Sequence, residues 1–228
     1  MSARQAVLLV GSARPRGTST SEVLGGRVLE NLAGNGMRTR VFRVSHCLRP
    51  EREAALLQAI DDADALVLAS PLYVDSLPYL VTRCLDRVAA HRRGPVQRAE
   101  VRLLAIVNCG FPEWEQTRTA LDICRVFARQ AGFSWTGGLG LGGGEAIAGS
   151  PLERLGRRAG RVARALDLAA EALFVGRPVP PEAQTLLSRP MVPPRLYTAI
   201  GTVRGVRTAR RHGVLRRLGD RPFVSRRG

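Results

Sequence analysis

Residues 6–24 read AVLLVGSARPRGTSTSEVL. The first five form an apolar run typical of a strand that is buried on both faces of a parallel sheet. A helical periodicity follows from about residue 19. The loop between them holds two glycines, two arginines and five hydroxyl side chains. A strand-to-helix turn needs little more than an N-cap residue and a glycine, so the surplus of hydrogen-bond donors indicates a ligand.

The same alternation of apolar runs and amphipathic periods continues along residues 1–175. Strands are expected near 6–11, 39–45, 65–70, 101–108 and 134–141, and helices near 19–34, 51–62, 77–91, 113–131 and 151–175. Val/Leu-rich strands that alternate with helices require a parallel sheet covered on both faces. The sequence therefore predicts an α/β fold with a doubly wound five-stranded parallel sheet, in the order 2-1-3-4-5.

The amino-acid composition changes beyond Val175. Six prolines between positions 178 and 194 argue against continuous helix and indicate a linker or an extended arm. Residues 1–175 are thus expected to form one domain, and residues 176–228 a Pro/Arg-rich, basic C-terminal arm. The apolar residues of the arm, Leu196, Tyr197, Ile200 and Val203, favour packing on the domain or on a second subunit of a homo-oligomer. An anionic membrane surface and a nucleic acid are less favoured partners for its arginines.

The formal net charge is +16, and the chain contains no lysine. The exclusive use of arginine as the basic residue resembles a coding bias, but a surface rich in Arg still attracts anions. No apolar run is long enough to cross a bilayer and no secretory pattern precedes the first strand, so a soluble, cytoplasmic protein is expected. The four cysteines lie far apart without a CxxC pair, which argues against a metal site and for reduced thiols.

The loop after the first strand can be interpreted in two ways. Its hydroxyls at Ser12 and residues 18–21 can converge with the helix N-terminus on a phosphate, whose charge Arg14 or Arg16 would neutralise. Alternatively, one hydroxyl caps the helix, Gly17 eases the turn and the arginines are solvated. A P-loop would need a lysine and a dinucleotide fingerprint would need further glycines, so the loop matches neither motif.

A second loop, after the third strand, favours the phosphate interpretation. It reads SPLY at residues 70–73, and Asp75 to Pro78 lead into the next helix. In a sheet with the order 2-1-3-4-5, the crevice opens where strands 1 and 3 diverge, and the loops after these two strands meet there. An aromatic residue in a proline-fixed turn, such as Tyr73, can serve as a platform for a planar ring.

Three stretches resemble the flavodoxin-like NADPH-dependent FMN reductases and NAD(P)H-dependent oxidoreductases. They are GSARPRGTSTSEVL at 11–24, DDADALVLASPLYVDSLPYLVTRCLDR at 61–87 and IVNCGFPE at 106–113. The resemblance covers about residues 5–175. It implies that the first loop binds the FMN phosphate through Ser12, Arg14, Ser19, Thr20 and Ser21. The hydroxyl run is longer than usual in the family, which leaves open which of the last three contacts the phosphate.

The resemblance also assigns the two other loops to the flavin ring. The backbone around Pro71, Leu72 and Tyr73 would contact the isoalloxazine. The third loop, which holds Asn108, Cys109, Gly110 and Phe111, would close over the other side of the ring, with the backbone of Cys109 and Gly110 at the flavin edge. A buried or lining role for Cys109 is favoured over a redox role, because the sequence offers nothing that would lower its pKa.

These features imply an FMN-dependent oxidoreductase that uses NADPH or NADH as co-substrate. Electrons would pass to a quinone, flavin, azo or nitro compound, and no side chain is assigned a catalytic role. Two alternatives are a flavodoxin-type electron carrier, against which the basic charge argues, and a flavin-free binding module that uses the arginine-rich arm.

Overall fold

The computed structural model describes residues 4–47, 49–94 and 99–220. Five parallel strands form one sheet in the order β2-β1-β3-β4-β5, which confirms the predicted topology. The strands are β1 (Gln5–Val10), β2 (Arg38–Arg43), β3 (Ala65–Pro71), β4 (Val101–Asn108) and β5 (Phe133–Leu141). Strand β1 lies between β2 and β3, so the chain reverses its direction of winding there, and the loops after β1 and β3 meet at one edge.

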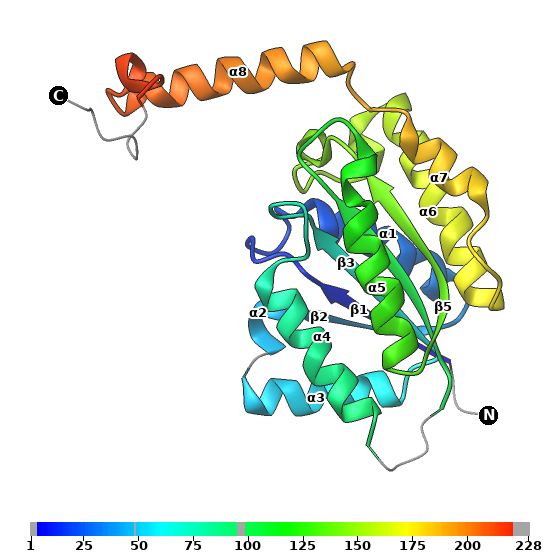
Figure 1. The fold of residues 1–228 in the computed structure, drawn as a ribbon. Coiled ribbons are helices and arrows are strands. Elements are labelled where there is room, and N and C mark those ends of the chain that lie inside the picture. The colour runs from blue at the N-terminus through cyan, green and yellow to red at the C-terminus, as the bar shows by residue number, and fades with distance from the viewer. Residues whose placement is uncertain (1–3, 48, 95–98, 221–228) are drawn as a thin grey trace. The chain divides into compact units, whose positions relative to one another are not determined.

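Helices cover both faces of the sheet (Figure 1). On one face lie α1 (Thr20–Gly34), α6 (Arg157–Val175) and α7 (Pro181–Ser188), and on the other α3 (Pro50–Asp61), α4 (Tyr79–Arg92) and α5 (Arg118–Gln130). The short helix α2 (Val44–Cys47) follows β2 directly. One-turn 3-10 helices lie at Trp114–Thr117, Gly144–Ala146 and Leu152–Leu155.

The apolar strands divide their side chains between two cores. In β1, Ala6, Leu8 and Val10 pack under α1 and α6, whereas Val7 and Leu9 pack under α3 and α4. All five are buried. A strand that must be apolar on both sides reads as a continuous run, which is why the opening stretch identified the fold class.

Two helices begin later than the sequence predicts. The last helix of the domain was expected from residue 151, but Gly156 has a φ of 71° and separates the 3-10 turn at Leu152–Leu155 from α6. Leu152 is nevertheless buried in the predicted stripe. Similarly, α5 is preceded by a 3-10 turn at Trp114–Thr117. Periodicity alone does not distinguish a helical turn from a 3-10 turn with the same buried residue.

The compact unit ends at Met191, not at Val175 as the sequence suggested. Each of the helices α7 and α8 (Pro194–Arg211) begins with a proline at its first position, where the missing N–H costs little, so two of the six prolines start helices. Ala183 and Leu187 of α7 are buried against α6. The Gln184 amide bonds both backbone groups of Gly140 on strand β5, at 2.8 and 3.1 Å.

The second compact unit comprises Val192–Gly228. Helix α8 spans 18 residues and is followed by a 3-10 turn at Leu215–Arg217. Its N-terminal half carries apolar residues one turn apart, and its C-terminal half is rich in arginine. Among the helices of the described chain, none is both long enough and apolar enough to cross a membrane.

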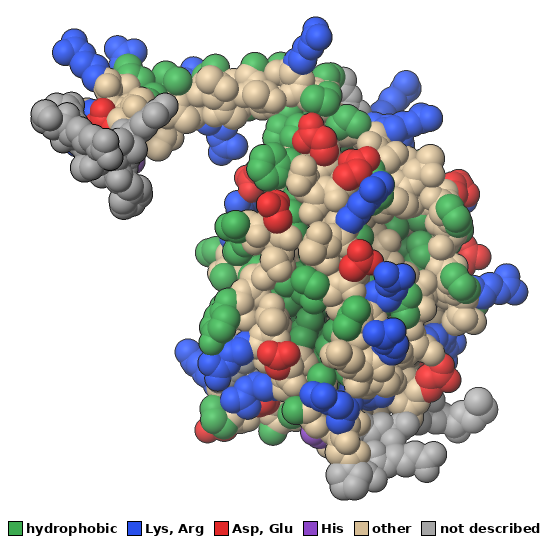
Figure 2. Space-filling view, viewed as in Figure 1, with side chains coloured by type: hydrophobic (Ala, Val, Ile, Leu, Met, Phe, Trp, Pro, Cys, Tyr) green, Lys and Arg blue, Asp and Glu red, His purple; other side chains and the backbone are tan. Residues whose placement is uncertain are grey.

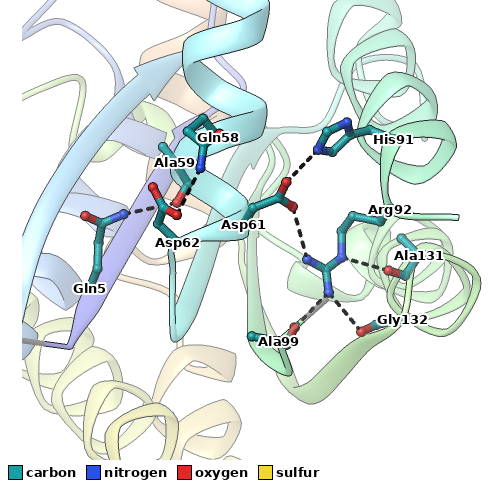
Figure 3. Close-up of polar contacts among 10 residues, drawn as sticks. All are labelled: Gln5, Gln58, Ala59, Asp61, Asp62, His91, Arg92, Ala99, Ala131 and Gly132. Atoms are coloured by element: carbon teal, nitrogen blue, oxygen red, sulfur yellow. Dashed lines mark hydrogen bonds and ion pairs between the residues drawn. The ribbon is translucent and has the colours of Figure 1, made fainter. Parts of the chain in front are cut away.

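A buried polar cluster joins the far ends of several elements (Figure 3). The side chain of Arg92, 3% exposed, donates to the carbonyls of Ala99, Ala131 and Gly132 at 2.9 to 3.3 Å. Asp61 lies 2.7 Å from His91 and 3.8 Å from Arg92. These groups lie at the carboxyl ends of α3 and α4 and just before β4 and β5. The cluster therefore closes the sheet at the amino end of its strands, away from the loops considered below.

On the face that carries α4 and α5, arginine and acidic side chains are interspersed (Figure 2). Several arginines are paired, including Arg27 with Asp167 and Arg87 with Glu53. Exposed pairs of this kind contribute little to stability, on the order of 0–1 kcal/mol.

Candidate functional site

One cavity brings together almost all of the residues selected from the sequence. Its volume is about 70 Å³, and it lies at the carboxyl ends of β1, β3, β4 and β5. It is lined by Ser12, Arg14, Ser19, Thr20, Ser21, Pro71, Leu72, Tyr73, Asn108, Cys109, Gly110 and Glu145. Phe111 is the one predicted site residue outside this lining, and it is 57% exposed. Glu145, which the sequence analysis did not assign, was detectable only by its position in the loop after the last strand.

The hydroxyls at the start of α1 have two different functions. The Thr20 hydroxyl donates to the carbonyl of Gly144, and the Ser21 hydroxyl donates to Oδ1 of Asn108, both at 2.7 Å. They tie the first loop to the loops after β5 and β4. The Ser19 side chain does not cap the helix, and Ser12 Oγ accepts a hydrogen bond from the Arg14 N–H, which leaves its proton available. Ser12 and Ser19 are therefore the hydroxyls that can donate into the cavity.

The helix itself adds donors at the same place. The first intrahelical hydrogen bond of α1 joins the Val23 N–H to the Ser19 carbonyl. The preceding N–H groups of the first turn have no partner within the helix, and the positive end of the helix dipole is directed toward the cavity. Hydroxyls and N–H groups at a helix N-terminus are the donors that bind a phosphate.

Two ion pairs hold the first loop in place. Arg14 pairs with Glu145 at 2.6 Å, and both side chains are about half exposed. On the other side of the loop, Arg43 pairs with Glu22 at 2.8 Å, and Arg43 also donates to the Arg14 carbonyl. Glu22 in turn accepts from the Gly17 N–H. Arg14 is thus a cation at the edge of the cavity whose partner is the chain's own carboxylate.

The second loop is a tight turn with an unusual backbone. The N–H of Tyr73 donates to the carbonyl of Ser76 and the N–H of Ser76 to that of Tyr73, so Val74 and Asp75 occupy the two central positions. Their φ angles are 49° and 58°. A two-residue turn of this kind strongly favours Asn and Gly, because a β-branched residue is strained at positive φ. Val74 is 97% exposed, so its side chain gains no packing in return.

This strain predicts a stabilising substitution. Val74→Asn should raise the free energy of unfolding by about 1 kcal/mol, because Asn adopts a left-handed backbone more readily than Val. Urea denaturation measures the change. The matched control is Val41→Asn, at a half-exposed valine on the edge strand β2, which should lose stability because Asn disfavours a strand. A loss of stability in Val74→Asn would show that the turn is not strained.

The third loop is held by backbone bonds that leave few free groups. The N–H of Cys109 donates to Leu141, and the N–H groups of Gly143 and Gly144 donate to Phe111 and Cys109. Both backbone polar groups of Cys109 are therefore hydrogen-bonded within the protein, and its N–H is not free to bind a flavin. In the second loop the N–H groups of Leu72 and Tyr73 are likewise bonded. In the described parts of the second and third loops, the N–H groups of Val74, Asp75, Gly110 and Phe111 form no such backbone bond, so they are available to a ligand.

The glycine run after residue 137 also has a structural explanation. A Cβ at Gly140 would lie 2.2 Å from Thr117 Oγ1, and one at Gly142 would lie 2.1 Å from the carbonyl oxygen of Pro112. These glycines allow the third loop and the start of α5 to pack directly on β5 and the residues after it. Close internal packing thus accounts for the glycines at these two positions.

Cys109 lines the cavity, and its thiol is buried. Its Sγ lies 3.4 Å from the carbonyl oxygens of Phe111 and Glu113, and burial raises the pKa of the thiol. We expect iodoacetamide at pH 7.5 to alkylate Cys109 far more slowly in the native chain than in guanidinium chloride, because only the thiolate reacts. Mass spectrometry of the Cys109 peptide measures both rates. Rapid native labelling would contradict the assignment.

The donor set suits a phosphate ester carried by a larger group. Two free hydroxyls, the first-turn N–H groups of α1 and the Arg14 guanidinium surround a space of about 70 Å³. That space is sufficient for the phosphate end of a ligand, while the exposed side chain of Tyr73 at its rim is suited to contact a planar ring. The residues present therefore fit FMN.

A family model described as NADPH-dependent FMN reductase matches residues 5–134, which is more than half of the chain. The chain belongs to this family. Membership implies FMN as the cofactor and NAD(P)H as the co-substrate of an oxidoreductase. The matched residues include the first, second and third loops. A search of curated proteins gave no match to this FMN reductase family member.

Solved structures with the same fold include oxidoreductases and a flavodoxin. An NADH:FMN oxidoreductase in its apo form is 18% identical with a TM-score of 0.57, and the match covers 85% of this chain and 99% of that one. An NAD(P)H:quinone oxidoreductase from Methanothermobacter marburgensis is 18% identical with a TM-score of 0.53 and coverages of 73% and 96%. A Streptococcus pneumonia TIGR4 flavodoxin is 14% identical with a TM-score of 0.52 and coverages of 76% and 99%. At these identities the likeness is one of fold.

Proposed function

We propose that the cavity holds the phosphate end of FMN and that the protein catalyses electron transfer from NAD(P)H to a planar small molecule, namely a quinone, a flavin, an azo compound or a nitro compound. The observation that carries this proposal is the convergence of three loops, selected for three different features, on one cavity at the switch point of the sheet. Bound FMN would supply the redox chemistry by taking a hydride from NAD(P)H and releasing electrons to the acceptor.

The chain's own residues bind and orient the flavin. Ser12, Ser19 and the first turn of α1 donate to the phosphate, and Arg14 exchanges its Glu145 partner for the phosphate charge. Leu72 and Tyr73 form one wall for the ring. Gly110 offers its N–H from the opposite loop. No described side chain is required to move a proton, because the redox chemistry resides in the cofactor.

A spectroscopic experiment tests the proposal in two steps. The purified full chain, reconstituted with FMN, should be yellow and should bleach when NADPH or NADH is added without oxygen. Addition of a quinone, an azo dye or a nitroaromatic should restore the colour at a rate that depends on the acceptor. A chain that takes up no FMN would refute the cofactor assignment. A chain that bleaches but is reoxidised by no acceptor of these classes would refute the acceptor assignment.

A flavodoxin-type carrier remains the alternative from the same fold, since a flavodoxin is among the structural neighbours. The decisive difference is the source of electrons. An enzyme of this family is reduced directly by the nicotinamide, whereas a carrier requires a partner protein. Direct bleaching by NAD(P)H alone therefore separates the two.

A further inference from the structure

A second and much larger cavity lies on the other side of the first loop. Its volume is about 750 Å³, within the range of small-molecule sites, and it surrounds the carboxyl end of the edge strand β2. The loop at residues 13–16, helix α1 and the start of α3 form its walls. Arg14 lines this cavity and the smaller one, so the two adjoin at a single side chain.

The charged groups of this second cavity are unequally paired. Four arginines line it, and Glu22 is its one acidic lining residue. Glu22 is already paired with Arg43, and Arg14 is paired with Glu145. Arg16 and Arg52 are both exposed, and neither forms an ion pair with a residue that the structure describes. The cavity thus has two unneutralised guanidinium groups, which can bind a phosphate in a bidentate manner.

The remaining wall is apolar and suits a flat ring. Val41 and Phe42 of β2 line the cavity together with Ala55 of α3. Phe42 is half-buried, and the Arg40 guanidinium lies over its ring at 5.1 Å. An aromatic wall beside free arginines fits a nucleoside that carries a phosphate monoester, whose charge at neutral pH is close to −2.

We propose that this second cavity binds the adenosine 2′-phosphate end of NADPH and makes the chain prefer NADPH over NADH. Arg16 and Arg52 hold the 2′-phosphate, and the wall at Val41 and Phe42 contacts the adenine. Arg14 marks the point where the pyrophosphate half passes toward the flavin. This inference rests on the proposed function, because it requires the nicotinamide end of the same molecule to reach the flavin ring beside the smaller cavity.

The test compares two nucleotides that differ only in the 2′-phosphate. Adenosine 2′,5′-bisphosphate and 5′-AMP are titrated calorimetrically into the FMN-loaded full chain. We expect the bisphosphate to bind at least about tenfold more tightly, since a charge-assisted contact contributes that much or more. In the Arg16→Ser/Arg52→Ser double variant the preference should fall to about threefold or less. The ratio of the KM values for NADH and NADPH should fall in parallel.

A matched double variant separates a specific site from general attraction. Arg129→Ser/Arg164→Ser removes the same charge from exposed positions on α5 and α6 and should keep the full preference. An equal loss in both double variants would overturn the proposal, as would equal binding of the two nucleotides by the yellow wild-type chain. A chain that binds no FMN but retains the preference would contradict the proposed function alone and support this site.

Discussion

The Ser12→Ala/Arg14→Ala double variant should lose at least about a hundredfold in FMN affinity while keeping its fold. Each hydrogen bond to a charged phosphate is worth roughly 1.5–3 kcal/mol, and two of the proposed donors are removed. The cost in stability should stay below about 1 kcal/mol, because the Arg14–Glu145 pair is half exposed. Quenching of flavin fluorescence measures the affinity, and urea denaturation of the flavin-free chain measures the stability. An unchanged affinity would show that this loop does not bind the FMN phosphate.

The partner of Arg14 provides a control of opposite sign. Glu145 lines the cavity and neutralises Arg14, so its carboxylate competes with an incoming phosphate. Glu145→Gln keeps the shape of the side chain and removes the charge. FMN binding should then tighten about three- to tenfold, with the larger gain at low salt. A weaker binding in Glu145→Gln would mean that Glu145 positions Arg14 for the ligand and does not compete with it.

The Arg92→Met variant should lose about 3–5 kcal/mol of stability, the largest effect expected from a single substitution outside the apolar cores. Arg92 is almost fully buried, donates to three carbonyls and lies over the ring of Phe133 at 4.3 Å. Methionine fills much of the same volume but leaves these carbonyls without a donor and weakens the compensation of the Asp61 charge (Figure 3). Urea denaturation of the flavin-free chain measures the loss.

Two comparisons make the Arg92 prediction specific. Arg125→Met removes an exposed arginine that pairs with Asp122, and its effect should stay within about 0.5 kcal/mol. The folded Arg92→Met chain should bind FMN as the wild type does, since the cluster lies at the opposite end of the strands from the cavity. A stability change below about 1 kcal/mol would show that the buried guanidinium is replaceable. Reduced FMN affinity would show coupling between the two ends of the sheet.

The order of elements could be predicted from the sequence because parallel strands that are buried on both faces appear as uninterrupted apolar runs. Ala6 to Val10 are apolar without interruption, since both faces of β1 are covered, and this holds again at residues 65–69. The helix beginnings were less predictable. Gly156 interrupts the helix through its backbone angle, and a residue pattern does not reveal that angle. The prolines after Val175 were compatible with helix starts as well as with an extended arm.

The residues that line the candidate cavity could be predicted from the sequence, but the hydrogen bonds among them could not. Twelve residues line the cavity, and the resemblance supplied eleven of them, Glu145 being the exception. The sequence did not distinguish Ser19 from Thr20 and Ser21, because the distinction depends on hydrogen bonds to residues far along the chain. The Thr20 hydroxyl is hydrogen-bonded to the Gly144 carbonyl, and the Ser21 hydroxyl to the Asn108 amide oxygen. Long-range partners of this kind have no local signature in the sequence.

The contact between Gln184 and Gly140 covers an open edge of the sheet. The Gln184 amide bonds both the N–H and the carbonyl of Gly140, as a residue of a neighbouring strand would. Four residues earlier on β5, the Thr136 carbonyl accepts a hydrogen bond from the Val179 N–H. The outer margin of β5 is thereby closed to pairing with another chain. A polypeptide that ended at Val175 would keep all five strands but would expose this edge of β5. We expect such a shortened chain to self-associate through the exposed edge.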